Sequence, residues 1–347
     1  MMGRIHENMR GWGPAAIAMT ACSLVVIAGW YALRSESDPS TEGHGLHRFG
    51  NGDVQSVIES AETLRLQGES EKSEAVLRAA VADYANVQDA HIALGELLID
   101  KSSVISATSK HETTLNEAYR CYERALEIGP RSADLEFIAG TLATKIDRWE
   151  RALEHYAAAQ DFDDRDPRYP LYLAQVHMKF NQLAEAKSNL VHAASLDPQV
   201  ASVWGSLAEI ALRENAPESA LEQIAKARQL ESGKTVWRLI QARALKRLNK
   251  PEEAIQLLIG LDDAEKLDGG VLSVIGECYG MLDQPGPVAD LYAKAAQLNP
   301  SDGKIALEAS RWLKQAGRTQ EAIGHAERAA MLGVSGAREM VRELKGE

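Results

Sequence analysis

The sequence predicts an all-α protein in which about eight helix pairs stack into a solenoid, with a C-terminal capping helix and one N-terminal transmembrane helix. Three observations predict this fold. Alanine recurs every 34 residues, a second series of small residues follows seven positions later, and one N-terminal stretch is apolar and uncharged. We expect a tail over 1–12, a transmembrane helix over 13–33, a flexible tether over 34–52, the array over 53–334 and the capping helix over 335–347.

The stretch 13–33 has the length of a membrane span. It contains 21 residues without a charge, and a bilayer core of roughly 30 Å requires about 20 helical residues. Trp12 and Tyr31 lie near its two ends, where aromatic rings prefer the membrane interface. We expect a retained anchor. The alternatives are a signal peptide cleaved after Ala28 and, less well supported, a lipoprotein signal at Cys22.

The charges that flank this stretch favour one orientation by a small margin. Arg4, Arg10 and the amino group precede it, whereas Arg34 and the more distant Arg48 follow it. The positive-inside rule then places the N-terminus in the cytoplasm. We therefore expect the array to be extracytoplasmic, on the periplasmic face of a bacterial inner membrane. The tether over 34–52 is rich in Gly, Ser and acidic residues and has no apolar period.

The repeat is visible in two alanine series. The first consists of Ala118, Ala152, Ala186, Ala220, Ala254 and Ala322, with Val288 in the gap; the second consists of Ala125, Ala159, Ala193, Ala227, Leu261, Ala295 and Ala329. Two helices of about 14 residues and two short turns require about 34 residues. Small side chains permit the helices to cross closely. Pro130, Pro198 and Pro300 mark the ends of units, because proline cannot continue a helix.

This pattern resembles the tetratricopeptide repeat (TPR) family. The family motif is matched by Trp204, Leu207, Ala208, Ala220, Ile224 and Ala227, with Ala211 in place of the usual Tyr. The resemblance implies a right-handed superhelical solenoid. Two units depart from the motif: Arg238 and Gln241 replace an apolar pair, and Glu136 stands where Trp is usual. We expect these two units to pack less tightly.

The unit boundaries follow from the period. We expect units at about 56–87, 88–132, 133–166, 167–200, 201–234, 235–268, 269–302 and 303–334. The second unit contains about eleven extra residues, 101–111, which are rich in Ser and Thr and are expected to form an exposed loop. The polar segment 335–347 suits a solvated cap.

Composition excludes several classes of function. A net charge of −12 argues against a nucleic-acid partner, and three cysteines cannot build a disulfide scaffold. The chain lacks the spacings typical of zinc, phosphate-loop or calcium sites. We therefore expect no enzymatic activity, no metal and no cofactor. Cys121 and Cys278 lie too many repeats apart to form a bond.

The resemblance implies that positions 2, 5, 9, 12 and 13 of each unit line a concave groove. From residue 167 onward these positions carry a mainly basic set of candidate peptide-binding residues: Arg168, Gln175, Lys179, Arg213, Arg243, Lys246, Arg247, Lys304, Arg311 and Lys314. Earlier units contribute Asp89, Glu96, Asp100 and Asp134. Arginine forks bind carboxylates, so we hypothesise an acidic peptide segment as ligand. The alternative is a solvated face that keeps the array soluble.

The function that this sequence favours is a membrane-tethered TPR scaffold that binds or assembles other proteins, with the lipid bilayer contacted through 13–33. One alternative is a secreted or periplasmic soluble scaffold after signal cleavage. A less favoured one is an enzyme with an unrecognised site.

Overall fold

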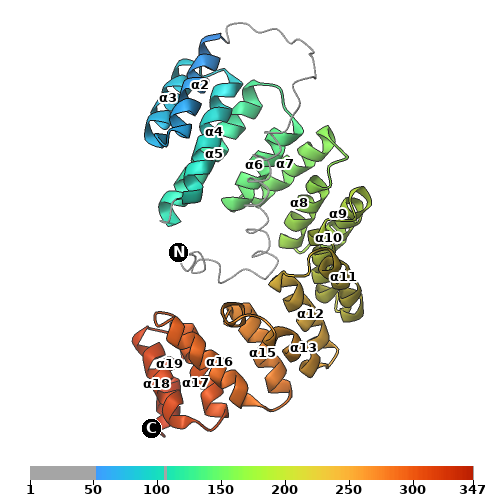
Figure 1. Ribbon diagram of the computed structural model, residues 1–347, viewed down its shortest axis with the longest axis vertical. Helices are drawn as coiled ribbons and strands as arrows, with labels where there is room; N and C mark the ends of the chain where they lie inside the picture. Colours follow the sequence, from blue (N-terminus) through green and yellow to red (C-terminus); the bar gives the residue numbers. More distant parts are fainter. Residues whose placement is uncertain (1–51, 105–107, 347) are drawn as a thin grey trace. The chain divides into compact units, whose positions relative to one another are not determined.

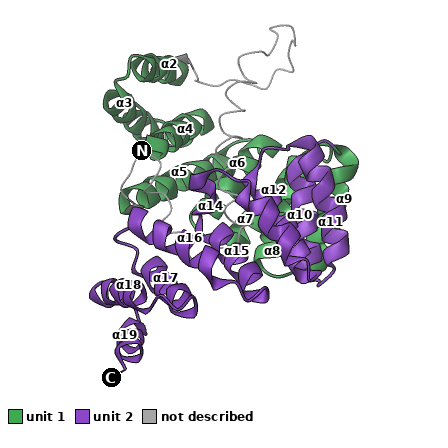
Figure 2. Ribbon diagram, turned by 60° about the horizontal axis from the view of Figure 1, so that its bottom comes forward, with its two compact units in different colours: residues 1–198 green, residues 199–347 purple. Residues whose placement is uncertain are grey.

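The computed structural model describes residues 52–104 and 108–346, and these residues form helices and turns without a strand (Figure 1). The expected all-helical fold is confirmed. The chain divides into two compact units, unit 1 up to Pro198 and unit 2 from Gln199 (Figure 2). The transmembrane helix expected over 13–33, and the tether before Gly52, lie outside the described residues. In the part that the structure describes, no helix has the length and apolar character that crossing a bilayer requires.

Each unit consists of helix pairs. Unit 1 contains α2 (Gly52–Leu66) with α3 (Ser70–Asp83), α4 (Gln88–Val104) with α5 (Thr108–Ile128), α6 (Ala133–Lys145) with α7 (Trp149–Phe162), and α8 (Arg168–Lys179) with α9 (Leu183–Leu196). Unit 2 contains α10 (Ala201–Arg213) with α11 (Pro217–Leu230), α12 (Thr235–Arg247) with α13 (Pro251–Ile259), the short α14 (Asp263–Lys266), α15 (Gly269–Met281) with α16 (Pro285–Leu298), α17 (Gly303–Gln315) with α18 (Thr319–Met331), and α19 (Ala337–Lys345).

The alanines that reveal the period lie where the helices of a pair cross. All the alanines of both series are fully buried, and Val288 is buried with them. Tight contacts also require glycine: a Cβ atom on Gly140 would lie 2.7 Å from the Tyr156 ring, and one on Gly205 would lie 2.1 Å from the Trp237 ring. Side-chain volume at the crossing therefore limits how closely the two helices approach.

The turn between the two helices of a pair repeats with the same period. Asp147, Asn181, Asn215, Asn249 and Asp283 all have φ near +58°, and Gly317 has φ +74°. Asn, Asp and Gly are the residues that best tolerate this left-handed conformation. The next residue's N–H donates to a carbonyl five positions back, as Ala216 does to Ala211 at 2.8 Å. This bond closes the first helix with a Schellman motif.

In the insertion at 101–111, the described residues are helical and do not form the loop that the sequence suggested. Residues 101–104 extend α4, and residues 108–111 extend α5. These described residues include neither Gly nor Pro, which is compatible with helix in both places. Contacts also hold it in place: the Lys101 ammonium pairs with Glu71 at 3.0 Å and also with Glu74, and Nδ1 of His111 lies 2.8 Å from the Ser102 carbonyl oxygen.

Two of the repeats, 133–166 and 235–268, depart from the TPR motif. In both, polar contacts replace apolar ones. In the 235–268 unit, Trp237 is buried in place of the missing aromatic residue, and Arg228 of α11 donates to the Gln241 side chain. Helix α13 is correspondingly short and ends before Gly260. In the 133–166 unit, Glu136 is completely buried.

Candidate functional site

The candidate residues all lie on first helices of their pairs. Three are on α8, one on α10, three on α12 and three on α17. The packing of α10 against α12 brings one subset together in unit 2: Arg213, Arg243 and Arg247. We call these three residues and Glu209 the arginine cluster.

In unit 1, Arg168 belongs to a structural corner. Its guanidinium lies 2.6 Å from the Asp166 carboxylate and 3.7 Å from that of Asp134, and it also lies 5.0 Å from the centre of the Phe137 ring. Burial lowers the pKa of Arg168, but its acidic partners outweigh this effect and the net shift is upward. The Lys179 ammonium lies 4.8 Å from the Trp149 ring centre. Arg168 is therefore already compensated by its own repeats.

The arginine cluster in unit 2 has looser geometry. Arg213 Nε lies 3.7 Å from Glu209 Oε1, and Arg243 Nη1 lies 3.6 Å from Glu209 Oε2. Both separations exceed hydrogen-bond distance. Arg247 donates to the carbonyl of Leu212 in the last turn of α10, where cations are favoured by the helix dipole. One carboxylate thus faces two guanidinium groups without a close bond to either.

Burial is the main influence on the electrostatics of Arg243. Burial lowers the pKa of Arg243 below its ordinary value, and the nearby Arg247 lowers it further, although Glu209 and Glu277 raise it. Arginine still keeps its charge at neutral pH. An additional anion near Arg243 would therefore be stabilised electrostatically.

The remaining candidates are mostly paired with acidic residues of the same unit. Lys246 pairs with Glu277 of α15, and Lys314 of α17 pairs with Glu343 of α19. Arg311 pairs with Glu308 one turn away on α17. Two candidates have exposed or half-buried side chains and no partner that would define a site, namely Lys304 at the start of α17 and Gln175 on α8. The structure does not gather these residues with the arginine cluster.

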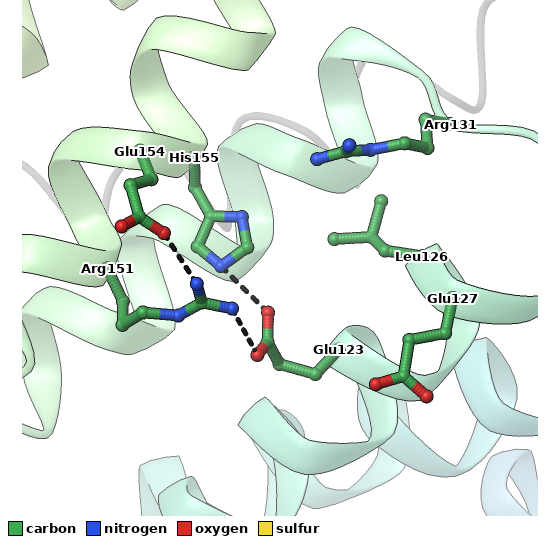
Figure 3. Close-up of a pocket in the computed structure, with 7 residues that line it drawn as sticks. All are labelled: Glu123, Leu126, Glu127, Arg131, Arg151, Glu154 and His155. Atoms are coloured by element: carbon green, nitrogen blue, oxygen red, sulfur yellow. Dashed lines mark hydrogen bonds and ion pairs between the residues drawn. The ribbon is translucent and has the colours of Figure 1, made fainter.

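Unit 1 contains a polar pocket that the sequence did not reveal. It has a volume of about 300 Å³ and lies between α5 and α7, lined by Glu123, Leu126, Glu127, Arg131, Arg151, Glu154 and His155 (Figure 3). Gln88 of α4 donates at 2.9 Å to the Pro130 carbonyl, which fixes the loop carrying Arg131. Side chains from two repeats therefore converge on this pocket.

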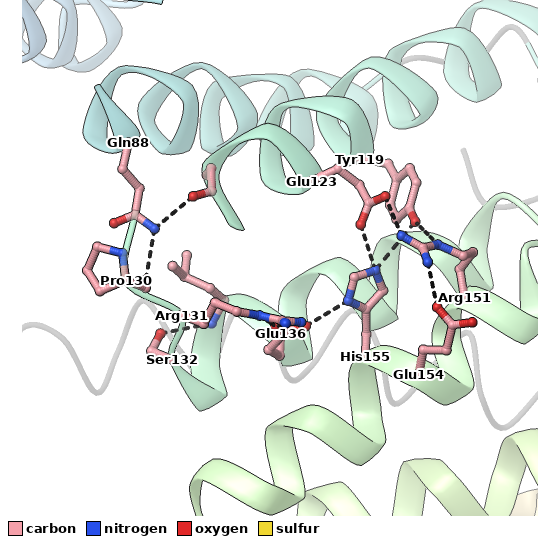
Figure 4. Close-up of polar contacts among 12 residues, drawn as sticks. Gln88, Tyr119, Glu123, Pro130, Arg131, Ser132, Glu136, Arg151, Glu154 and His155 are labelled. Carbon is pink, nitrogen blue, oxygen red and sulfur yellow. Dashed lines mark hydrogen bonds and ion pairs between the residues drawn. The ribbon is translucent and has the colours of Figure 1, made fainter. Parts of the chain in front are cut away.

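A buried charge network forms one wall of this pocket (Figure 4). Glu136 Oε2 lies 2.7 Å from His155 Nδ1, and Glu136 Oε1 lies 2.5 Å from the Arg131 guanidinium. The other ring nitrogen, Nε2, lies 2.9 Å from Glu123 Oε1. Each ring nitrogen of His155 thus lies within hydrogen-bond distance of a different carboxylate. Arg151 continues the network by pairing with Glu123 at 2.8 Å.

Hydrogen bonding dominates the electrostatics of Glu136. Burial raises the pKa of this carboxyl, but hydrogen bonds from His155 and Arg131 outweigh burial, so the pKa lies below its usual value. The charged form is therefore well satisfied inside the fold. In the sequence, the signal for this network is Glu136, which stands where the TPR family usually has Trp. Only the structure identifies His155 as the partner of Glu136.

Two further features bear on chemistry. Burial raises the pKa of both Cys121 and Cys278 to about 11, so neither thiol is activated as a nucleophile. Among residues 52–104 and 108–346, no group of three or more His, Cys, Asp or Glu side chains is placed to hold a metal ion.

The comparisons with known proteins agree with this geometry. Residues 208–309, less than a third of the chain, match a family model described as the N-terminal TPR repeats region of Psidin. This match places TPR-like repeats within 208–309. No curated protein matches the sequence.

Several solved structures are similar to this chain in fold. The APC/C hetero-tetramer Cut9–Hcn1 has a TM-score of 0.53 at 12% identity, covering 85% of this chain and 57% of that one. Pseudomonas aeruginosa pilF has a TM-score of 0.51 at 19% identity, covering 66% and 100%. YrrB, a TPR protein with an unusual peptide-binding site, has a TM-score of 0.47 at 21% identity, covering 54% and 91%.

Proposed function

We propose that this protein is a membrane-tethered TPR scaffold that holds other proteins together by binding an acidic segment of a partner on the first-helix face of unit 2. TPR folds present side-by-side helices as binding surfaces, which supports a role in protein–protein interaction. The observation that carries the choice of ligand is the arginine cluster. The guanidinium groups of Arg213 and Arg243 lie 3.7 and 3.6 Å from the Glu209 carboxylate, beyond hydrogen-bond distance, and Arg247 lies beside them on α12.

The same cluster supports a carboxylate ligand over an apolar one. Guanidinium groups offer paired donors that match carboxylate geometry. The side chains of Arg213 and Arg243 retain 32% and 27% of their exposure, so a ligand on the surface reaches them. We therefore keep the acidic peptide as the proposed ligand. Its proposed binding residues are now only those of the arginine cluster.

A charge reversal tests the ligand. Arg243→Glu in the full-length chain should abolish capture of a bead-bound peptide rich in Asp and Glu, because it places a carboxylate where the ligand carboxylate binds. Arg318→Glu is the matched control, since it makes the same charge change at a turn where Arg318 pairs with Asp290 and Glu321. Unchanged capture by Arg243→Glu would refute this binding site.

The membrane tether rests on the uncharged stretch 13–33 and remains part of the proposal, with the N-terminus cytoplasmic and the array periplasmic. Fractionation combined with intact-mass measurement tests it. We expect the unprocessed chain in the membrane fraction. A mature chain beginning near Gly29 in the soluble fraction would replace the tether with a soluble periplasmic scaffold.

A further inference from the structure

The pocket between α5 and α7 is formed by second helices of unit 1, so it is separate from the first-helix face of the proposed function. Its lining includes His155, which is buried and lies between the carboxylates of Glu136 and Glu123 at 2.7 and 2.9 Å. A hydrogen bond of 2.9 Å to the Pro130 carbonyl fixes the loop that carries Arg131. Side chains that are already held in place lose little conformational entropy when a ligand binds.

Opposite charges line two sides of this pocket, and each is paired elsewhere. Figure 3 shows Arg131 on one side, Glu127 on the other and the Leu126 side chain between them. The Glu127 carboxylate pairs with Arg124 on the same helix at 2.9 Å. The Arg131 guanidinium pairs with buried Glu136 at 2.5 Å. Different partners therefore hold the two charges apart, with an apolar side chain in the gap.

Both charged groups keep capacity for a ligand. The Arg131 guanidinium uses Nε and Nη2 for Glu136, which leaves Nη1 as a further donor. The Glu127 carboxylate uses Oε2 for Arg124, which leaves Oε1 as an acceptor. The side chains of Arg131 and Glu127 are 53% and 64% exposed, so a ligand in the pocket reaches both. Because the pair of Glu127 with Arg124 lies on the surface, exchanging it for a ligand contact costs little.

We infer that this pocket binds a ligand that ends in a carboxylate and carries an amine several methylenes away, as the C-terminal lysine of a peptide does. The carboxylate accepts from Arg131, the methylenes pack on Leu126 and the ammonium group pairs with Glu127. A volume of about 300 Å³ lies at the lower end of the range for ligand pockets and suits one such residue. The inference does not depend on the proposed function, because it concerns unit 1 and a different ligand.

A ligand with both charges fits the pocket better than a ligand with one. A lone carboxylate would meet the pocket's three glutamates, and a lone ammonium group would meet its two arginines. Like charges brought together lower the affinity of a complex, whereas complementary charges favour it. Free lysine also has an ammonium group next to its carboxylate, and that group would face Arg131. The corresponding nitrogen of a peptide end is an uncharged amide, which favours the peptide end as the source of the ligand.

Isothermal titration calorimetry on the full-length protein tests this inference with three probes. Nα-acetyl-L-lysine has the amide, the free carboxylate and the side-chain ammonium group of a peptide end, and we expect it to bind saturably. Its amide lacks the carboxylate, and free L-lysine adds the second ammonium group. Both should bind about tenfold more weakly, as for the loss of one charge-assisted contact. The carboxylate contact is tested on the ligand because Arg131 also holds the buried Glu136.

Two matched variants of α5 locate the binding site. Glu127→Gln removes the carboxylate that pairs with the ligand's ammonium group, and it should weaken binding of Nα-acetyl-L-lysine about tenfold. Glu112→Gln removes the same charge from an exposed position on α5 that does not line the pocket, and it should leave the affinity unchanged. Both side chains are exposed, so neither substitution disturbs the core.

The outcomes are decisive for this pocket and leave the proposed function to its own test. The inference is wrong if Nα-acetyl-L-lysine does not bind, if its amide binds equally well, or if Glu127→Gln leaves the affinity unchanged. Equal weakening by Glu127→Gln and Glu112→Gln would also overturn it, because binding would then follow net charge alone. Binding of free L-lysine as tight as that of Nα-acetyl-L-lysine would overturn the choice of a peptide end. None of these results concerns the arginine cluster, whose role is decided by the capture experiment with Arg243→Glu.

Discussion

Unit 1 and unit 2 each bury one glutamate on the first helix of a helix pair. The two glutamates differ in how closely cationic side chains approach their carboxylates. Glu136 in unit 1 is completely buried and has hydrogen-bond distances of 2.5 and 2.7 Å to Arg131 and His155. Glu209 in unit 2 has cations no closer than 3.6 Å, and one of its oxygens has no hydrogen-bond partner. In the first arrangement both carboxylate oxygens are held by short contacts, whereas in the second one oxygen of the buried carboxylate has no hydrogen-bond partner. How completely a buried charge is satisfied therefore separates a structural network from a candidate binding site.

Breaking the closed network should have the largest effect. Glu136→Ala leaves His155 and Arg131 without their shared carboxylate in a buried position, and we expect it to lower the free energy of unfolding of unit 1 by about 3–5 kcal/mol. Urea unfolding followed by hydrogen exchange on α6 and α7 measures this loss. Glu209→Ala is the matched variant in unit 2, with an expected loss of at most about 1.5 kcal/mol, because this carboxylate has no short contact with a cation to lose. Equal losses in the two variants would erase the distinction between the two glutamates.

The same network predicts a pH dependence. The pKa of Glu136 is lowered in the folded state, so its contribution is present above the ordinary carboxyl pKa and is lost as pH falls through the lowered value. The stability difference between the wild type and Glu136→Gln should therefore stay constant from neutral pH to about 5 and shrink below the usual Glu pKa of about 4.3. Urea midpoints at several pH values measure it. A difference that shrinks already between pH 7 and 5 would contradict the assignment.

A crossing-point substitution tests packing in unit 2. The Cβ atom introduced by Gly205→Ala would lie 2.1 Å from the Trp237 ring, so we expect a loss of about 1–3 kcal/mol from overpacking. The control is Gly324→Ala in α18, where nothing lies within 4 Å of the new atom. That variant should be neutral or gain up to about 1 kcal/mol, because alanine favours a helix over glycine. Thermal melts of the two variants should move in opposite directions.

The smallest expected effect concerns a feature that both units share. Asn181 and Asn215 occupy the same left-handed turn position in unit 1 and unit 2. Replacing either one by Ala should cost about 1 kcal/mol, and replacing either one by Gly should cost little. Chemical denaturation of the four variants measures this. Unequal costs in the two units would indicate that the turn does not behave as a repeated element.

The sequence predicted the helix pairs because their crossings require small residues, and those residues recur at a fixed spacing. A second periodic signal is the turn residue at Asp147, Asn181, Asn215 and Asn249, which recurs with the same spacing and adopts a left-handed conformation in each case. The helical character of residues 101–104 and 108–111 does not follow from the sequence, because the Ser and Thr content of the insertion suggests a loop.

The candidate site was predictable only in part. Basic residues at the groove positions located Arg213, Arg243 and Arg247, but their compensation by acidic residues could not be derived from position alone. The partners lie about one repeat away in sequence, as Glu209 does from Arg243 and Glu277 from Lys246. Likewise, the role of Glu136 depends on His155, which only the packing of α6 against α7 identifies.

Site-specific photo-crosslinking in the native host tests the central claim most directly. Ser206 lies on α10, three residues before Glu209 and seven before Arg213, and therefore shares their helix face. Glu222 lies exposed on α11 of the same repeat. A crosslinker at Ser206 should capture a partner through a segment with neighbouring acidic residues, and a crosslinker at Glu222 should not. Capture from Glu222 but not from Ser206 would contradict the account.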